Sequence, residues 1–140
     1  LNGNKFIRWE MKDILKIDEN FNNYDGICMS YGLRNLENVE DGIKKVFGLL
    51  GDKGRAGFLD FNHSELNSLS DIFQKIYLRL VVVPISKIFR LGKEYSYIEK
   101  SIKNYPEGSK LILIAKEVGF KKVEYRTIFW NQMGILILEK

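Results

Sequence analysis

A strand, a helix and a second strand follow one another in the first half of the chain, and this succession constrains the fold most. The apolar run 27–29 stops at Ser30, which is typical of a short buried strand that ends in a loop. Asn38 can cap a helix over 39–50, and the compact apolar run 55–61 predicts another strand. Because parallel strands need such a crossover, the sequence predicts an α/β sheet.

Polar residues follow the first of these strands. In an open α/β sheet, ligands bind beyond the carboxyl ends of the strands, so Ser30, Arg34 and Asn35 are candidate site residues. The side chain of Arg34 is then expected to project into the crevice rather than into the core. The residues alone leave a second interpretation open, in which Arg34 and Asn35 form only a solvated turn and the start of a helix.

The remaining elements are predicted from their alternating residues and from the residues that begin and end them. An alternating run at 6–9 predicts an additional strand near the start, and Gly51 should stop the helix that Asn38 begins. A final helix should be capped by Ser109 and stopped by Gly119. The alternating runs 123–129 and 134–139 predict a C-terminal hairpin.

Composition and charge exclude several classes of protein. With 140 residues and 45% hydrophobic residues, the chain fits a single domain with a sizeable core. Its net charge of +4 is spread along the chain, without the basic block of a nucleic-acid-binding protein, and indicates solubility or attraction to an anionic membrane surface. No run is apolar and long enough to cross a bilayer, and no signal peptide is present, so we expect an intracellular protein.

Single residues give weaker signals. Cys28 is the only cysteine, which excludes an intramolecular disulfide, and its place in an apolar strand predicts a buried, inert thiol. His63 is the only histidine, and no metal site is expected. Leu1 stands inside what reads as a strand, so we expect the sequence to be a fragment.

The run Ser-Tyr-Gly-Leu-Arg-Asn at 30–35, preceded by Tyr-Asp and followed by a helix and Leu-Asp-Phe-Asn at 59–62, resembles the UbiE/MenG-type quinone-biosynthesis C-methyltransferases. These enzymes use S-adenosylmethionine. Three later motifs are most similar to the cyanobacterial and plastid branch that makes phylloquinone: Val-Val-Val-Pro at 81–84, the segment 91–98 and Tyr-Pro-Glu-Gly at 105–108. Where that branch carries small residues, this chain has Phe-Trp-Asn at 129–131, which changes the expected wall of the substrate pocket.

The resemblance implies a Rossmann-like class I methyltransferase sheet, present here as its C-terminal portion. The whole of 1–140 would be one partial domain, with a lid over the substrate inserted at 66–108. A complete enzyme of this kind also has a glycine-rich loop and a second strand ending in an acid, and neither is recognisable here, since Gly3 stands alone. The two absent strands would lie between the strands at 6–9 and 27–29.

The resemblance also implies roles for individual residues. Arg34 and Asn35 would be catalytic, with Arg34 stabilising a phenolate or positioning a water molecule and Asn35 orienting that water or the quinol oxygen. The resemblance also implies two sets of binding residues. Those for the cofactor are Asp13, Ile14 and Ser30, and those for the substrate are Tyr31, Tyr77, Tyr95 and Tyr97. The alternative is that these residues occupy ordinary loop or packing positions.

The function implied is C-methylation of a prenylated naphthoquinol with S-adenosylmethionine as the methyl donor. The alternatives are a related ubiquinone or menaquinone enzyme that acts on a different prenyl quinol, or a non-catalytic scaffold that binds no cofactor. Expected partners are the quinol, a membrane surface contacted weakly, and either a second copy of the chain or a completing N-terminal segment. The expected location is the cytoplasm, at the membrane surface, or a plastid in a eukaryote.

Overall fold

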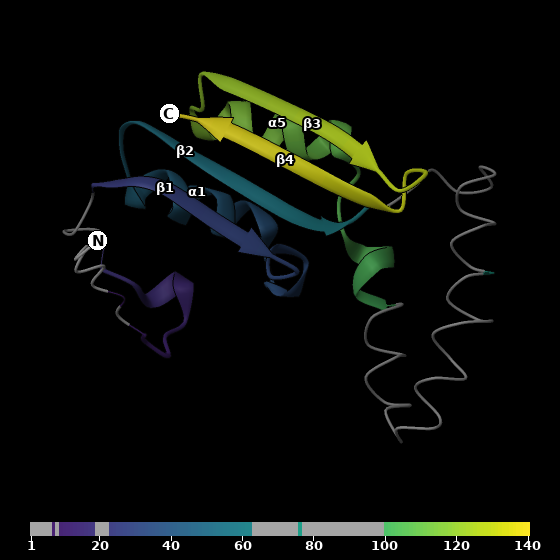
Figure 1. The fold of residues 1–140 in the computed structure, drawn as a ribbon, viewed down its shortest axis with the longest axis horizontal. Coiled ribbons are helices and arrows are strands. Elements are labelled where there is room, and N and C mark those ends of the chain that lie inside the picture. Colours follow the sequence, from purple (N-terminus) through teal and green to yellow (C-terminus); the bar gives the residue numbers. More distant parts are fainter. Residues whose placement is uncertain (1–6, 8, 19–22, 63–75, 77–99) are drawn as a thin grey trace, which may run out of the picture.

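A four-stranded mixed sheet forms the centre of the molecule (Figure 1). The computed structural model describes residues 7, 9–18, 23–62, 76 and 100–140. The strands are β1 (Tyr24–Ser30), β2 (Leu50–Phe61), β3 (Lys122–Ile128) and β4 (Met133–Glu139), in the spatial order β1-β2-β4-β3. The pair β1 and β2 is parallel, whereas β4 runs antiparallel to both of its neighbours. The predicted parallel unit and the predicted C-terminal hairpin are both confirmed.

The crossover helix α1 (Val39–Leu49) begins where the sequence predicts. The side-chain oxygen of Asn38 accepts a hydrogen bond from the N–H of Glu40 at 2.9 Å, which satisfies one of the open donors of the first turn. The predicted stop at Gly51 is wrong. Leu50 is already extended and fully buried, so the chain passes directly into β2, and Gly51 lies within that strand.

In the second covering helix, α5 (Gly108–Val118), the predicted end is correct and the predicted start is not. Its predicted stop is confirmed, because Gly119 adopts a left-handed φ of 116° and its N–H donates to the carbonyl groups of Ala115 and Lys116. Its predicted start is wrong. The helix begins one residue before Ser109, with Glu107 in the cap position and no side-chain hydrogen bond there.

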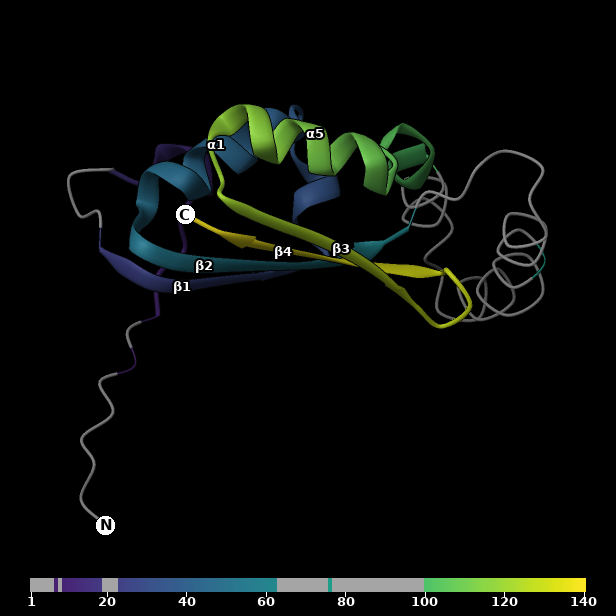
Figure 2. The ribbon, with the colours of Figure 1, turned by 90° about the horizontal axis from the view of Figure 1, so that it is seen from above.

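Both helices cover the same face of the sheet (Figure 2). They bury a single core, in which Ile43 and Val46 of α1 and Leu111 of α5 meet Phe58, Leu136 and Leu138 of the sheet. Among the residues that the structure describes, no helix lies on the opposite face. Ile27 and Met29 pack against the core, so Cys28 between them lies on the opposite face; it is exposed, and the prediction of a buried thiol is wrong.

The described residues near the start form no strand. Ile7, Trp9 and Met11 are 71%, 89% and 102% exposed, and only a short 3₁₀ turn, η1 (Ile14–Lys16), follows them. The predicted strand at 6–9 is therefore wrong for its described residues. An isolated strand leaves its backbone groups unpaired and its apolar side chains in water, so it gains nothing by forming.

The expected lid insertion at 66–108 lies mostly outside the described residues. Its described end is helical at 100–104 and anchored by Tyr105, which is only 4% exposed. No helix in the described part of the chain is long and apolar enough to span a membrane.

Candidate functional site

The candidate site begins at the carboxyl end of β1. A second 3₁₀ turn, η3 (Leu33–Asn35), follows the strand, and Leu33 fixes it by inserting a 1% exposed side chain into the core. The backbone N–H of Arg34 then donates to Oδ2 of Asp60 at 3.2 Å. Because Asp60 lies near the end of β2, this bond joins the ends of the two parallel strands.

A buried ion pair occupies this junction. Nε of Arg34 lies 2.8 Å from Oδ1 of Asp60, and the two side chains are 6% and 3% exposed. The N–H of Phe61 also donates to Oδ1 of Asp60, at 2.9 Å. Burial raises the pKa of Asp60, because the loss of hydration outweighs these hydrogen bonds and the charge of Arg34. Most of the Arg34 side chain is enclosed by these contacts, and the same residue lines a cavity at the strand ends, so Arg34 is both buried and part of the predicted crevice.

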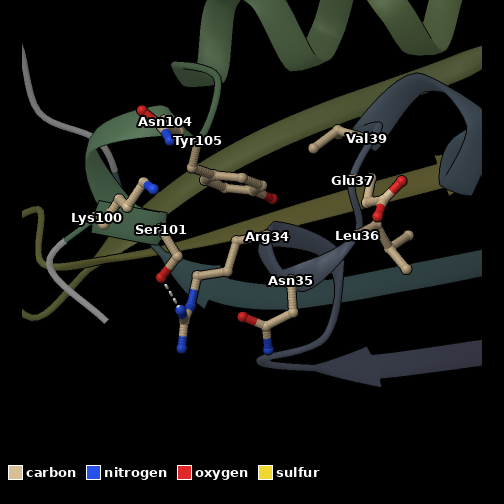
Figure 3. Close-up of a pocket in the computed structure, with 9 residues that line it drawn as sticks. All are labelled: Arg34, Asn35, Leu36, Glu37, Val39, Lys100, Ser101, Asn104 and Tyr105. Carbon is tan, nitrogen blue, oxygen red and sulfur yellow. Dashed lines mark hydrogen bonds between the residues drawn. The ribbon is translucent and has the colours of Figure 1, made fainter. Parts of the chain in front are cut away.

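The far end of Arg34 reaches a third segment. Nη1 donates to the hydroxyl oxygen of Ser101, which belongs to the helical residues 100–104 (Figure 3). The guanidinium carbon also lies 5.3 Å from the ring centroid of Phe61, within the range of a cation–π contact. Arg34 therefore connects the loop after β1, the end of β2 and the helix that precedes α5.

A cavity of about 350 Å³ opens beside the guanidinium group. Its lining residues come from η3, the start of α1 and the segment 100–105 (Figure 3): Arg34, Asn35, Leu36, Glu37, Val39, Lys100, Ser101, Asn104 and Tyr105. Burial, together with the nearby charge of Asp60, raises the pKa of Tyr105, so its hydroxyl stays protonated at neutral pH. The cavity thus combines a fixed cation, an amide and a neutral phenol.

Asn35 and Tyr31 are held together at the mouth of this region. The side-chain Nδ2 of Asn35 donates to the carbonyl oxygen of Tyr31 at 2.7 Å. Tyr31 adopts a left-handed φ of 56°, packs its ring 5.3 Å from that of Phe61, and donates its hydroxyl hydrogen to the sulfur of Met133 at 3.7 Å. The structure therefore brings Tyr31, Arg34 and Asn35 to one end of the sheet.

The other predicted site residues lie apart from the cavity lining. Ser30 is exposed at the end of β1. Asp13 uses Oδ1 to accept from the N–H of Leu15 at 3.0 Å, so it caps η1, and Ile14 belongs to the same turn. This turn packs against α1. The remaining three tyrosines lie outside the described residues: Tyr77, Tyr95 and Tyr97.

A second polar layer borders the site. Asn62 is 7% exposed, and its side-chain oxygen accepts a hydrogen bond from the hydroxyl of Tyr125 at 2.7 Å. Its Nδ2 donates to the carbonyl oxygen of Asn131 at 2.9 Å. Burial and the charge of Asp60 raise the pKa of Tyr125 to about 12, which keeps this hydroxyl a donor. The layer fixes the turn between β3 and β4 to the end of β2.

Of the residues that line the cavity, only Arg34 and Asn35 were predicted as site residues from the sequence. Asp60, Ser101 and Tyr105, which contact Arg34 or lie beside it, were not. A signal existed for Asp60, because a carboxylate at the end of an apolar strand is costly to bury without a partner. Ser101 has no such signal, since its contact with Arg34 spans 67 positions of the chain.

Comparison with known proteins identifies the family. The model of the ubiE/COQ5 methyltransferase family matches residues 2–137. The chain belongs to this family. It is 37% identical over 134 residues to a 2-phytyl-1,4-naphtoquinone methyltransferase of Synechocystis sp., covering 96% of this chain and 56% of the relative. A chloroplastic 2-phytyl-1,4-beta-naphthoquinone methyltransferase of Arabidopsis thaliana is 32% identical over 133 residues, which are 95% of this chain and 51% of that protein.

The fold agrees with these matches. An O-methyltransferase family protein from Burkholderia thailandensis superposes with a TM-score of 0.58 at 14% identity, over 95% of this chain and 35% of that one. The predicted methyltransferase-like sheet and the predicted resemblance to the phylloquinone branch are confirmed. The chain spans about half the length of the two curated relatives described above.

Proposed function

We propose that this chain forms the C-terminal part of an enzyme that methylates a ring carbon of a prenylated naphthoquinol, with S-adenosylmethionine as the methyl donor. The observation that carries the proposal is the buried, doubly held Arg34 beside a cavity at the carboxyl ends of two parallel strands. Family membership and the naphthoquinone relatives support the substrate class.

Arg34 supplies a permanent positive charge where negative charge develops. Transfer of the quinol hydroxyl proton to a water molecule leaves a phenolate, which makes the neighbouring ring carbon nucleophilic. Once that carbon carries the methyl group, it releases its own hydrogen as a proton to water, which restores the aromatic ring. A guanidinium already held by Asp60 and Ser101 stabilises that phenolate with little reorganisation. The side-chain oxygen of Asn35 lies on the guanidinium side in Figure 3, where it can accept from the quinol hydroxyl or an ordered water.

Two described residues are candidates for binding the adenosine side of the cofactor. The exposed hydroxyl of Ser30 at the end of β1 and the exposed carboxylate of Asp13 are of the types that bind the polar groups of adenosine. Bound S-adenosylmethionine would supply an electrophilic methyl group. Among the described residues no glycine-rich loop follows a strand, so the methionyl side has no counterpart here.

The proposal includes a further segment of protein that completes the sheet and the cofactor site. Within the described residues, β1 pairs only with β2, and the face that carries Cys28 is without a helix. The relatives have further length that this chain does not match. We propose that an N-terminal segment, rather than a second copy, pairs with the edge of β1 and covers this face. A dimer seen by sedimentation without such a segment would favour the second copy.

The test is a chimeric enzyme in which this chain replaces the matched part of the Synechocystis relative. We expect transfer of the labelled methyl group from S-adenosylmethionine to 2-phytyl-1,4-naphthoquinol. Arg34→Lys should lower turnover per folded molecule by about a hundredfold, because the ammonium keeps the charge but loses the planar donor fork. Glu40→Gln, on the exposed first turn of α1, is the matched control and should leave turnover unchanged.

A folded chimera that binds S-adenosylmethionine but transfers no methyl group would contradict the proposed reaction. A folded chimera that binds neither cofactor nor quinol would favour the scaffold alternative. Transfer to a ubiquinone-type ring, with the naphthoquinol unused, would move the activity to the related branch.

The substrate places this chemistry at a membrane surface. A long prenyl tail partitions into a bilayer, because burial of each methylene group is favourable by about 0.8 kcal/mol. We propose that the enzyme contacts that surface peripherally. Its net charge of +4 favours an anionic leaflet.

A further inference from the structure

Three exposed aromatic residues at one end of the sheet share an unusual backbone. Tyr31, Phe129 and Trp130 have φ values of 56°, 51° and 52°, and these residues are 40%, 69% and 83% exposed. Bulky side chains at positive φ are strained, at a cost of about 1–2 kcal/mol per residue. We call these three residues the aromatic tip.

Hydrogen bonds hold this strained backbone in place. The N–H of Tyr31 donates to the carbonyl oxygen of Leu59 at 2.8 Å. The N–H of Asn62 donates to the carbonyl oxygen of Gln132 at 2.9 Å. The hydroxyl of Thr127 donates to the side-chain oxygen of Asn131 at 2.5 Å, across the turn. The surrounding structure therefore fixes the aromatic tip while leaving Phe129 and Trp130 largely exposed to water, where apolar surface is costly.

The aromatic tip lies at the same end of the sheet as the cavity. Met133, which follows the turn, pairs with Phe61 of β2 and accepts the hydroxyl hydrogen bond of Tyr31. Phe61 in turn lies under the guanidinium group of Arg34. The described N-terminal segment, which contains Trp9, lies far from this turn in both Figure 1 and Figure 2.

We propose that the aromatic tip inserts into the interfacial layer of a lipid bilayer and turns the cavity toward the membrane. This inference rests on the proposed function, because a quinol with a hydrocarbon tail must reach the cavity from lipid. Trp and Tyr favour the membrane interface, where an apolar ring and a polar group are both accommodated.

A protein partner fits these observations less well. Stable protein interfaces bury about 1,200–2,000 Å² in total, which three side chains around a projecting turn do not supply. Insertion into lipid needs no complementary surface, and its strength grows with the apolar area that enters. The size and shape of the aromatic tip therefore favour a bilayer.

The two tryptophans of the chain provide a matched test. Trp9 is 89% exposed and lies outside the tip, so Trp9→Phe leaves Trp130 as the reporter, and Trp130→Phe leaves Trp9. With vesicles of phosphatidylcholine and phosphatidylglycerol carrying brominated acyl chains, we expect Trp130 fluorescence to shift to the blue and to be quenched. Trp9 fluorescence should change little. An unchanged Trp130 signal, or quenching of Trp9 alone, would overturn the proposal.

Binding strength gives a second readout. Trp130→Ala should lower the vesicle partition coefficient by about tenfold or more, and Trp9→Ala by less than about twofold. A blue shift of Trp130 that depends on protein concentration without vesicles would indicate contact between copies and overturn the lipid assignment. No quinol is present in these assays, so their failure is separate from failure of methyl transfer in the chimera.

Discussion

Truncating Arg34 should destabilise the protein strongly, because it leaves a buried carboxylate without its cation. The Arg34 and Asp60 side chains are 6% and 3% exposed and lie 2.8 Å apart. Removing one partner of such a pair costs about 3–5 kcal/mol, against a total stability of about 5–15 kcal/mol for a domain. Arg34→Ala is therefore expected to fold, with a melting temperature lowered by roughly 10–20 °C.

The assay is urea unfolding at pH 7, followed by far-ultraviolet circular dichroism. Asp60→Asn should also destabilise, because the buried guanidinium group then loses its charge partner. Replacing both residues, as Arg34→Met with Asp60→Leu, removes both buried charges but also takes the acceptor from the backbone N–H groups of residues 34 and 61, so it should recover only part of the loss. A loss below about 1 kcal/mol for Arg34→Ala would refute the reasoning, because that is the value of an exposed pair.

The pH dependence of stability checks the same pair independently. The pKa of Asp60 is raised in the folded state, so the unfolded state loses its proton first, and stability falls as pH rises from about 3.8 through the folded pKa. Arg34 opposes this shift, so Arg34→Ala should raise the pKa further and deepen the fall. Asp60→Asn should remove this contribution. A shallower fall in Arg34→Ala would contradict the assignment.

Three further predictions concern other parts of the chain. Calorimetry of the isolated chain should show no micromolar binding of S-adenosylmethionine, because the described residues offer candidates only for its adenosine side; micromolar binding would show that the cofactor site is misplaced. Gly134→Ala should destabilise by several kcal/mol, since its Cβ would lie 1.9 Å from the Tyr125 hydroxyl, whereas Gly57→Ala meets nothing within 4 Å and should be nearly neutral; equal melting temperatures would contradict this. Asn38→Ala should cost about 1 kcal/mol by removing the cap of α1, and unchanged urea unfolding would refute it.

The sequence predicted the elements whose signals are local. The apolar run that became β1, the cap at Asn38 and the left-handed stop at Gly119 each depend on neighbouring residues. The predicted helix end at Gly51 was wrong because strand β2 already begins at Leu50, so Gly51 lies within a strand. The predicted burial of Cys28 was wrong because the burial of a strand residue depends on what covers each face of the sheet, which is a tertiary property.

In the candidate site, too, local features were predicted and long-range contacts were not. Arg34 and Asn35 were predicted, since a polar loop after an apolar strand is visible in the sequence. The burial of Arg34 was not predicted, because its partners Asp60 and Ser101 are 26 and 67 positions away along the chain. Only the spatial meeting of three segments turns an ordinary loop arginine into an enclosed cation.

The strand order has a consequence for how the chain is made. Among the described strands β3 pairs only with β4, and β4 also pairs with β2, although β3 is synthesised before β4. During translation β3 therefore leaves the ribosome before its native partner, and its native pairing forms only after Met133–Glu139 has emerged and inserted beside β2. Closing this long-range pairing is expected to limit the folding rate. The interval before β4 arrives is when a chaperone would be most useful to the nascent chain.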